Sequence, residues 1–518
     1  MRHLSSRAVA LAFFASCTVY NPPKVSEVPR PAATDSVAVA SPVKAHLLDG
    51  STVLYRAGVL VARDTVFQAG RNAFRYSLTL ADSAPVAPLP LDSVIGMETF
   101  RTSVNGGATV VLTTLTVGGT AAGLALAAIA IFGSCPTFYA DTAGVPSLEA
   151  EGFSYSIAPL FEARDVDRLR AQADARGDVR LEVRNEAMET HYINQVGLLD
   201  VHHGADELIV PDAGGRPLAL RGFVAPASAS DRAGRDLRSA LRDADGGAFS
   251  TDSGVVNRVS SADPDDYIDL AFARPVGIDT VALAFRMRNS LLNTVLLYEL
   301  MLADPGARSL DWMGQDLDKI GPAARLGRWY GGRMGMHVLV RDGVAWREVG
   351  RIPDTGPIAW DDVALPIPVP SGDSLRIRLR FVADDWRIDR VQLALGVRRP
   401  AARVIHPAEV LGADGLPDTA ARASIDAPDR RYLVTSPGQR FEIRFAAGAP
   451  PLADSARTFL LVSQGYYVEW LRASWMKGPH NPRTFEPSDD ALVDALHRWR
   501  GERADYERRF AATRIPVR

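Results

Sequence analysis

A strict alternation of apolar and charged side chains constrains the fold of this chain more than any other feature of its sequence. Leu375-Arg-Ile-Arg-Leu-Arg-Phe381 places every apolar side chain on one face of a strand and every arginine on the other. Such a strand buries one face, as is common in antiparallel sheets. Further β-prone runs accompany it at 268–272, 281–285, 337–341 and 388–393. We therefore expect residues 248–398 to form an antiparallel β-sandwich of the jelly-roll or galactose-binding-like kind.

Strand patterns also cover most of the remaining chain, whose 518 residues suggest about three or four domains. Residues 46–105 alternate short apolar runs with turn signals and predict a small β barrel or meander. Residues 134–247 include the alternating run Val179–Arg184 and predict a second β unit. Residues 399–518 predict a C-terminal β segment followed by a helix. The predicted fold is thus mainly β and multi-domain.

Three helices are expected within this β framework. Leu291–Met301 is strongly apolar but too short to span a bilayer, which indicates a buried helical insertion. Ser230 is expected to cap a short helix over 231–243. Ser488 is expected to cap the final helix, which should dock on the body through Leu492, Leu496, Trp499, Tyr506 and Phe510.

The N-terminus has the features of a secretory signal. Arg2, His3 and Arg7 precede a short apolar run, and Phe14-Ala15-Ser16-Cys17 ends it. A cysteine directly after small residues resembles the lipobox of bacterial lipoproteins, although Phe14 stands where leucine is usual. The resemblance implies that residues 1–17 are a lipoprotein-type signal peptide and that Cys17 carries the lipid. The alternative is an ordinary signal with a chance cysteine.

Residues 18–45 are rich in proline, with Ser, Ala and Val between the prolines. Such a composition cannot bury enough apolar surface to fold alone and predicts a semi-extended tether. A tether would let the folded body stand off a membrane. We therefore expect the protein in the cell envelope, anchored at the outer membrane or on the periplasmic face. With Cys17 acylated, Cys135 would be a free thiol.

A second membrane signal is the run from Ala108 to Phe132, which contains no charged residue. As a helix rising about 1.5 Å per residue, it would exceed a hydrocarbon core of roughly 30 Å. Gly119 and Gly123 form a small-xxx-small pair that allows helices to approach closely, which suggests a homo- or hetero-oligomer. The alternative is a segment buried in a soluble core. Spanning the inner membrane would conflict with an external lipid anchor.

A motif after this hydrophobic segment resembles a known group of proteins. Ser134-Cys135-Pro136-Thr137-Phe138-Tyr139 is followed by Glu149-Ala-Glu151-Gly-Phe153 and, later, by Trp386-Arg-Ile-Asp389. Their order is similar to that in poorly characterised bacterial envelope lipoproteins, where a hydrophobic segment precedes a Ser-Cys-Pro-x-aromatic-Tyr motif. The resemblance implies a shared fold and no known activity. Residues 140–144 depart from the Trp/Tyr-Asp-Gly turn expected at that point.

The sequence carries no strong catalytic signature. G-x-S-x-G, P-loop, H-E-x-x-H, paired C-x-x-C and EF-hand patterns are all absent. The 58 basic and 61 acidic residues give a net charge of −3, without the basic excess of a nucleic-acid binder. We therefore expect a non-enzymatic protein that does not bind nucleic acid.

One candidate ligand platform is aromatic. Tyr466, Tyr467, Trp470 and Trp475 cluster in sequence beside Gly465. Aromatic faces bind sugars by stacking, and β-sandwiches provide such sites. The alternative is core packing beneath the C-terminal helix.

One candidate metal site is acidic. Asp243 and Asp245 precede a glycine turn and, together with Asp252, offer the oxygen ligands that Ca²⁺ prefers. The closing glutamate of a full calcium loop is missing. A solvated turn is the alternative.

These features predict a membrane-anchored envelope lipoprotein that acts as a binding or scaffold module. One alternative is a glycan-binding or glycan-active protein, in which Glu149 with Glu151, or Glu186 with Glu189, could supply paired acids. A second is an accessory subunit of a membrane complex, held by the segment 108–132.

Overall fold

A computed structural model describes most of the chain. The described residues are 20–28, 31, 35–40, 43–47, 52–55, 57–69, 73–76, 81–82, 87–104, 135–142, 145–187, 189–304, 312, 317, 320–429, 431–435, 438–449, 455–469, 485–512, 514 and 517. The signal peptide with Cys17, the hydrophobic segment 108–132, Trp470 and Trp475 lie outside them. The described fold is mainly β with several antiparallel sheets and a C-terminal helix, as the sequence predicted.

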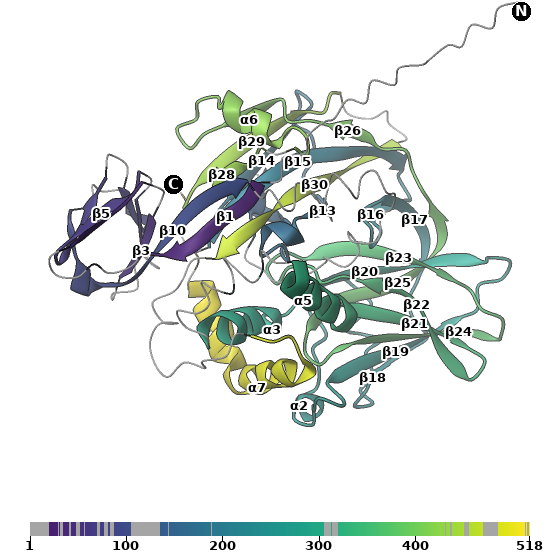
Figure 1. Cartoon of the computed structure of the whole chain (residues 1–518). Helices are drawn as coiled ribbons and strands as arrows, with labels where there is room; N and C mark the ends of the chain where they lie inside the picture. Colours follow the sequence, from purple (N-terminus) through teal and green to yellow (C-terminus); the bar gives the residue numbers. More distant parts are fainter. Residues whose placement is uncertain are drawn as a thin grey trace, which may run out of the picture.

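The first β-sandwich joins two stretches that are far apart in sequence (Figure 1). One sheet has the order β12-β11-β14-β29-β27, and the other has the order β13-β30-β15-β26 with β28 paired to β15. The strands are β11 Thr137–Thr142, β12 Val145–Glu151, β13 Ala163–Arg168, β14 Asp178–Arg184, β15 Glu189–Gly204, β26 Arg403–Ile405, β27 Glu409–Leu411, β28 Leu433–Thr435, β29 Arg440–Ala446 and β30 Ser455–Glu469. Strands from the expected 134–247 and 399–518 units therefore share the same sheets.

The second sandwich lies between these stretches in sequence. Its sheets have the orders β16-β17-β25-β20-β23 and β18-β19-β24-β21-β22. The strands are β16 Leu208–Pro211, β17 Pro217–Val224, β18 Ser228–Asp231, β19 Asp265–Ala273, β20 Thr280–Asn289, β21 Met336–Asp342, β22 Ala345–Ile352, β23 Asp361–Pro368, β24 Ser374–Val382 and β25 Trp386–Arg398. In β24 the apolar side chains are buried and the arginines lie outward, which confirms the alternation in the sequence. The antiparallel sandwich expected over 248–398 is thus present, but it begins earlier, because β16, β17 and β18 also belong to its sheets.

The small N-terminal β domain includes more of the chain than the sequence suggested. Its sheets have the orders β1-β10-β3-β4-β7-β8 and β2-β5-β6-β9. The strands are β1 Tyr20–Glu27, β2 Ser36–Val39, β3 Val43–Leu47, β4 Thr52–Tyr55, β5 Val59–Ala62, β6 Thr65–Gln68, β7 Ala73–Tyr76, β8 Ala81–Asp82, β9 Leu89–Pro90 and β10 Val94–Val104.

Residues 18–45, expected as a tether, supply β1, β2 and the start of β3 of this domain. The expectation rested on the inability of such a composition to form a core alone. Here the segment pairs with β10, β4 and β5, so its backbone is satisfied by partners from outside the segment. Its apolar side chains Val28, Val39 and Val43 are buried in that shared core.

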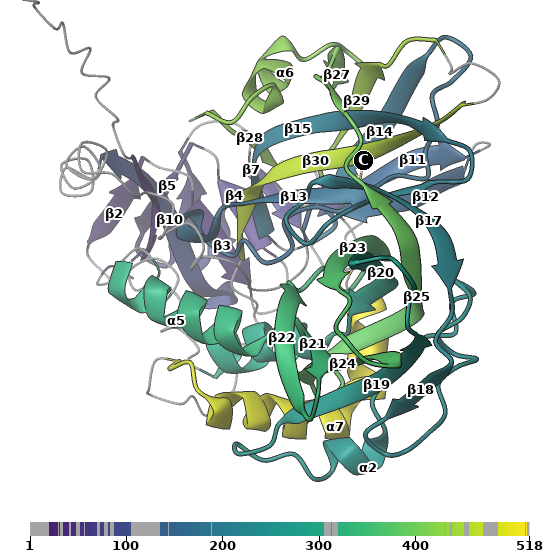
Figure 2. The same ribbon diagram turned by 90° about the vertical axis from the view of Figure 1, so that its right-hand side faces the viewer.

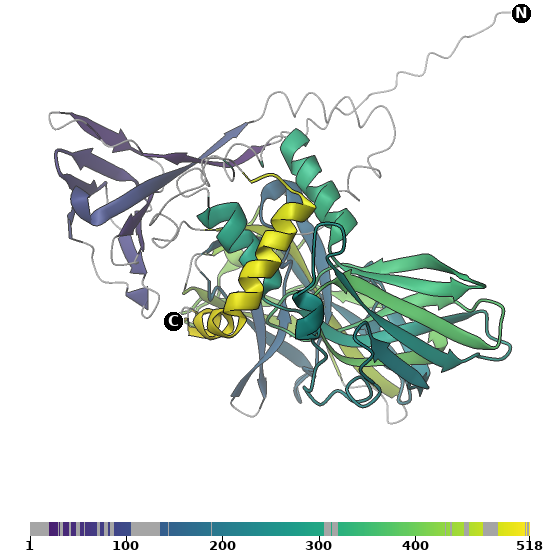
Figure 3. The ribbon, with the colours of Figure 1, turned by 90° about the horizontal axis from the view of Figure 1, so that it is seen from below.

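The longer helices gather on one side of the two sandwiches (Figure 3). The helical elements are the 3-10 turns η1 Leu91–Ser93 and η3 Pro159–Phe161, the α-helices α2 Ser253–Val256, α3 Leu292–Val295, α5 Ile320–Arg333, α6 Thr419–Ile425 and α7 Asp489–Ala512, and the π-helix η4 Leu296–Ala303. The buried insertion expected at 291–301 is confirmed by α3 and η4, whose apolar residues are in the core. No helix among the described residues has the length and apolar character needed to cross a membrane.

The C-terminal helix α7 docks as the sequence predicted. Ser488 Oγ accepts a hydrogen bond from the Ala491 N–H at 3.2 Å, so Ser488 caps the helix. Leu492, Leu496 and Trp499 are fully buried against α3 and η4.

The helix expected over 231–243 is absent. The Asp231 carboxylate instead accepts the Arg235 N–H at 2.8 Å, and Gly234 adopts a φ of 83°. A short polar side chain that bonds its own backbone competes with helix formation, and here a turn results.

Candidate functional site

The aromatic platform expected from the sequence is only partly described. Tyr466 and Tyr467 lie on β30 and are 4% and 0% exposed. Tyr466 stacks on Tyr192 with ring centroids 4.6 Å apart, and the Tyr467 hydroxyl donates to the Ser154 carbonyl at 3.2 Å. Both tyrosines thus pack in the core cluster that β30 shares with α3, η4 and α7, as the alternative of packing beneath the C-terminal helix predicted. Ligand binding by Trp470 and Trp475 stays a prediction, because they lie outside the described residues.

The three aspartates proposed for Ca²⁺ each make a local contact. Asp243 pairs with Arg242 at 2.8 Å, and Asp245 accepts the Gly247 N–H at 2.8 Å. Asp252 accepts the Gly254 N–H at 2.8 Å and caps α2. Across the described part of the chain, no group of three or more His, Cys, Asp or Glu side chains is arranged to hold a metal ion.

The acid pairs considered for glycan chemistry are engaged in structural contacts. Glu149 accepts the N–H groups of Arg170 and Ala171 at 2.6 and 3.1 Å. Glu186 accepts the hydroxyls of Thr137 and Tyr139 at 2.9 and 2.7 Å.

Glu189 and Glu151 also make contacts within the protein. Glu189 lies 2.6 Å from Nε2 of His191 within the core. Glu151 accepts the N–H groups of Ile358 and Ala359. The thiol of Cys135 donates to Glu151 Oε1 at 3.4 Å, and burial raises its pKa well above its usual range. A buried neutral thiol is a poor nucleophile, so Cys135 is a packing residue.

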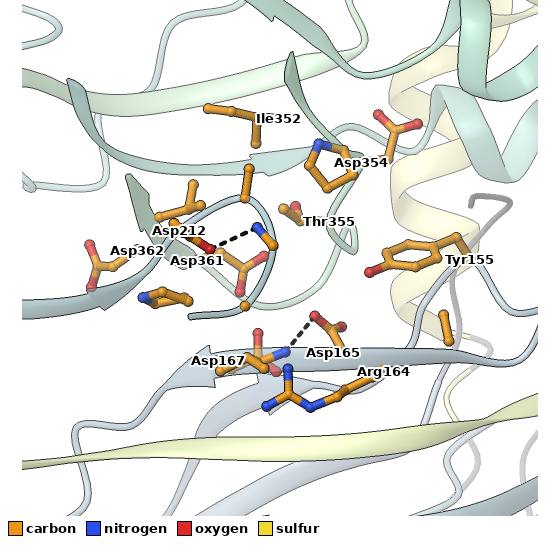
Figure 4. A pocket seen from close by; sticks show the side chains of 18 residues that line it. Tyr155, Arg164, Asp165, Asp167, Asp212, Ile352, Asp354, Thr355, Asp361 and Asp362 are labelled. Atoms are coloured by element: carbon orange, nitrogen blue, oxygen red, sulfur yellow. Dashed lines mark hydrogen bonds between the residues drawn. The ribbon is translucent and has the colours of Figure 1, made fainter. Parts of the chain in front are cut away.

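The two sandwiches lie against each other (Figure 2). A cavity of about 220 Å³ is lined by residues of both (Figure 4). Its walls come from β13 of the first sandwich and, in the second, from the turn between β16 and β17, the segment after β22 and the start of β23. The cavity is partly open to solvent. Its lining combines apolar surface with several carboxyl groups, as is usual for a small-molecule site.

Two of the carboxylates that line the cavity form ion pairs with guanidinium groups. Asp362 lies 3.2 to 3.4 Å from Arg168, Arg286 and Arg390, so it links β13 to the second sandwich. Asp212 lies 3.1 Å from Arg216 and 3.0 Å from Arg399 and also accepts two backbone N–H groups of its own turn. Asp362 thus connects the two sandwiches, whereas Asp212 stabilises its own turn and its contact with the segment after β25.

A third lining carboxylate, Asp354, is satisfied by neutral donors. It accepts the Asn289 amide at 2.9 Å and the Tyr330 hydroxyl at 2.5 Å. Its hydrogen bonds are thus used within the protein.

Three further carboxyl groups converge on the cavity with few protein partners (Figure 4). Asp165 and Asp167 come from β13, and Asp361 faces them from the start of β23. Asp165 accepts the N–H groups of Phe153 at 3.1 Å and Val166 at 2.9 Å. Asp167 is 6% exposed, and no donor of the described residues reaches its Oδ2 atom.

Asp167 and Asp361 influence each other electrostatically, and both are also influenced by Asp165 and Glu151. Burial, together with the neighbouring carboxylates, raises the pKa of both groups well above the usual range. Burial also raises the pKa of Asp165 to about 6, against the opposing effect of its backbone hydrogen bonds and of Arg164. The cavity is therefore a site whose protonation can change near neutral pH.

Sequence reasoning did not find this site. Asp165 lies in a stretch with the sequence Leu160-Phe-Glu-Ala-Arg-Asp165, and Asp361-Asp362 follows Trp360. Each is an ordinary acidic residue at a strand, and nothing local shows that β13 and β23 face each other. Only the packing of the two sandwiches brings these carboxyls together.

Comparisons with known proteins do not assign a family. No protein-family model matches the chain, and no curated protein matches its sequence. Among solved structures it is similar to a GH31 alpha-xylosidase from Xanthomonas citri, with 11% identity, a TM-score of 0.15, and coverage of 83% of this chain and 38% of that one. It is also similar to the cycloalternan-forming enzyme from Listeria monocytogenes, with 10% identity, a TM-score of 0.15, and coverage of 72% and 30%.

The chain spans less than two fifths of the length of either enzyme. A TM-score this low supports no inference about fold or function.

Proposed function

We propose that this protein is a non-enzymatic binding module of the cell envelope that holds a small polar ligand between its two β-sandwiches. The observation behind this proposal is the partly open cavity in which Asp167 Oδ2 meets no donor of the described residues. Leaving a buried polar atom without a hydrogen bond costs free energy, and a ligand donor would recover it. Such orphaned atoms in a cavity are a common sign of a binding site.

The arrangement of acids supports binding rather than glycan hydrolysis. Glu149, Glu151 and Glu186 accept hydrogen bonds within the protein, so none is free to act on a sugar.

Two neighbouring aspartates with raised pKa values also invite comparison with aspartic proteases, whose two aspartates share one proton. Such an enzyme must seat an extended peptide, whereas this cavity is smaller than the roughly 300 to 1,000 Å³ of typical ligand pockets. Release of peptides from unfolded casein at pH 4 to 6, abolished by Asp361→Asn, would contradict the non-enzymatic proposal.

The proposed location rests on the sequence. The lipobox-like Cys17 would anchor the module at the outer membrane or on the periplasmic face, and the segment 108–132 would add a second membrane contact or an oligomer interface. The resemblance to envelope lipoproteins supports the same location. An accessory role in a membrane complex is compatible with a binding module.

The test uses the full-length protein, purified with its anchor in detergent. Thermal unfolding is followed with a panel of small neutral sugars, organic cations and organic anions. We expect at least one class to raise the unfolding temperature. Thr355 lines the cavity, so Thr355→Tyr should abolish the shift by filling the space, whereas Thr355→Ser keeps the hydroxyl and should preserve it. A shift unaffected by Thr355→Tyr, or no shift with any class, would contradict the proposal.

A further inference from the structure

The charge balance around the cavity is uneven. Two of the carboxylates that line the cavity, Asp362 and Asp212, have guanidinium groups as partners. Within the described residues, no Lys, Arg or His nitrogen lies within 4.0 Å of the carboxylates of Asp165, Asp167 or Asp361. Arg164 influences Asp165 electrostatically without forming an ion pair.

A buried carboxyl group without a cationic partner must either hold a proton or receive positive charge from elsewhere. Burial and the neighbouring carboxylates raise the pKa of Asp167 and Asp361, which favours the first solution when the cavity holds no ligand. A bound cation is the second. The absence of any metal-like ligand arrangement among the described residues favours a cation that binds through N–H groups.

We propose that the inter-sandwich cavity binds an organic cation, an alkylammonium or guanidinium group, whose N–H groups donate to Asp165, Asp167 and Asp361. This inference rests on the proposed function and specifies its ligand class. Cationic N–H groups form the strongest hydrogen bonds to carboxylates. The apolar lining, including Ile352 and Pro353, suits the hydrocarbon part of such a ligand. The volume of about 220 Å³ admits a head group with a short chain.

Binding of a cation should expel a proton held by Asp167 or Asp361. Positive charge beside the Asp167–Asp361 pair favours the fully ionised form, and the effect is strong where water is excluded. Release of one proton on binding makes the affinity rise about tenfold per pH unit in the range where the pair still holds it. The other titratable or charged groups facing the pair are Asp165, Arg164, Glu151, Tyr155, Asp212, Asp354 and Asp362.

The experiment compares molecules of one size and different charge on the full-length protein. Putrescine, the neutral 1,4-butanediol and the anion succinate are titrated calorimetrically at pH 6, 7 and 8. Each titration is repeated in phosphate and in Tris, whose ionisation enthalpies differ. We expect putrescine to bind, the other two not to bind, the affinity to rise with pH, and the heats to report proton release.

Variants locate the binding. Asp167→Asn and Asp361→Asn should weaken putrescine binding at least tenfold. Asp243→Asn is the control, because Asp243 is exposed and does not line the cavity, and it should leave putrescine binding unchanged. Thr355→Tyr provides an independent block if either asparagine variant unfolds. Butanediol or succinate binding in the cavity without putrescine binding would overturn this inference and leave the proposed function intact. Putrescine binding that survives Thr355→Tyr would place the cation elsewhere and overturn the inference. The absence of binding by any class of ligand would overturn both.

Discussion

Glu151 and Gly356 lie in such close contact that the glycine cannot be replaced without displacing the carboxylate. A Cβ atom added to Gly356 would stand 2.2 Å from Glu151 Oε2. That oxygen accepts the N–H groups of Ile358 at 2.8 Å and Ala359 at 3.1 Å. The last residue of β12 in the first sandwich therefore holds a loop of the second sandwich, close to the start of β23 and to Asp361.

This contact predicts that Gly356→Ala destabilises the protein. The added methyl group must push the buried Glu151 carboxylate from its two backbone donors, which should cost about 2–4 kcal/mol. Urea unfolding at pH 7, followed by tryptophan fluorescence, measures the loss. Gly501→Ala is the matched control, because its Cβ would meet nothing within 4 Å on α7. Equal stabilities of Gly356→Ala and the wild type would show that the loop does not depend on Glu151.

A second prediction concerns the docking of α7. The Trp499 Nε1–H donates to Asp384 Oδ2 at 2.6 Å, and Arg387 pairs with the other oxygen at 2.8 Å. Trp499→Phe keeps an aromatic ring but removes this donor, so we expect a loss of about 1–3 kcal/mol. Amide hydrogen exchange should show faster exchange in α7 before the sandwiches are affected. Arg500→Ala, on the exposed face of the helix, should leave both quantities unchanged.

The local periodicity of the sequence predicted which faces of the elements are buried, but not which elements pair. The alternation at 375–381 and the helical face of α7 are both confirmed, because burial of one face follows directly from local spacing. The pairing of β14 with β29 joins Arg180 to Glu442, which are 262 residues apart. No local pattern specifies such a partner, and the first sandwich was therefore divided between two expected units.

The candidate site could not be predicted for the same reason. Asp167 and Asp361 belong to different sandwiches, and each has an ordinary neighbourhood in sequence. The acids that stood out in the sequence, such as Glu149 and Glu151, instead accept backbone N–H groups of other segments of the chain. Clustering in sequence thus indicated structural contacts, whereas the cavity arises from tertiary packing.

The membrane anchor gives a third prediction. Cys17→Ser should prevent acylation and move the protein from the membrane fraction to the soluble fraction after cell lysis. Mass spectrometry of the N-terminal peptide should show a lipid on the wild type only. Cys135→Ser is the control, because the buried Cys135 should have no role in anchoring. An unmodified wild-type peptide would contradict the lipoprotein proposal. Retention of Cys17→Ser in carbonate-washed membranes would assign the attachment to residues 108–132.

The last prediction concerns the pH dependence of stability. Burial raises the pKa of Asp167, so the folded protein binds more protons than the unfolded chain between the unfolded value of about 3.9 and the higher folded value. Stability from this group therefore falls as the pH rises through that window. Asp167→Asn removes the ionisation, so we expect it to be more stable than the wild type by about 1–3 kcal/mol at pH 7.5. The difference should shrink toward zero at pH 4.

Urea unfolding at pH 4 and at pH 7.5 measures this difference. Asp243→Asn is the control. The Asp243 carboxylate is exposed, so its replacement should change the free energy of unfolding only slightly at either pH. The comparison is made without ligand, because a bound cation would stabilise the ionised wild type and reverse the order of the two proteins. The opposite outcome is a stability of Asp167→Asn, relative to the wild type, that is lower at pH 7.5 than at pH 4. It would mean that the Asp167 carboxylate is stabilised in its charged form. The cavity would then already contain the positive charge that we assign to the ligand.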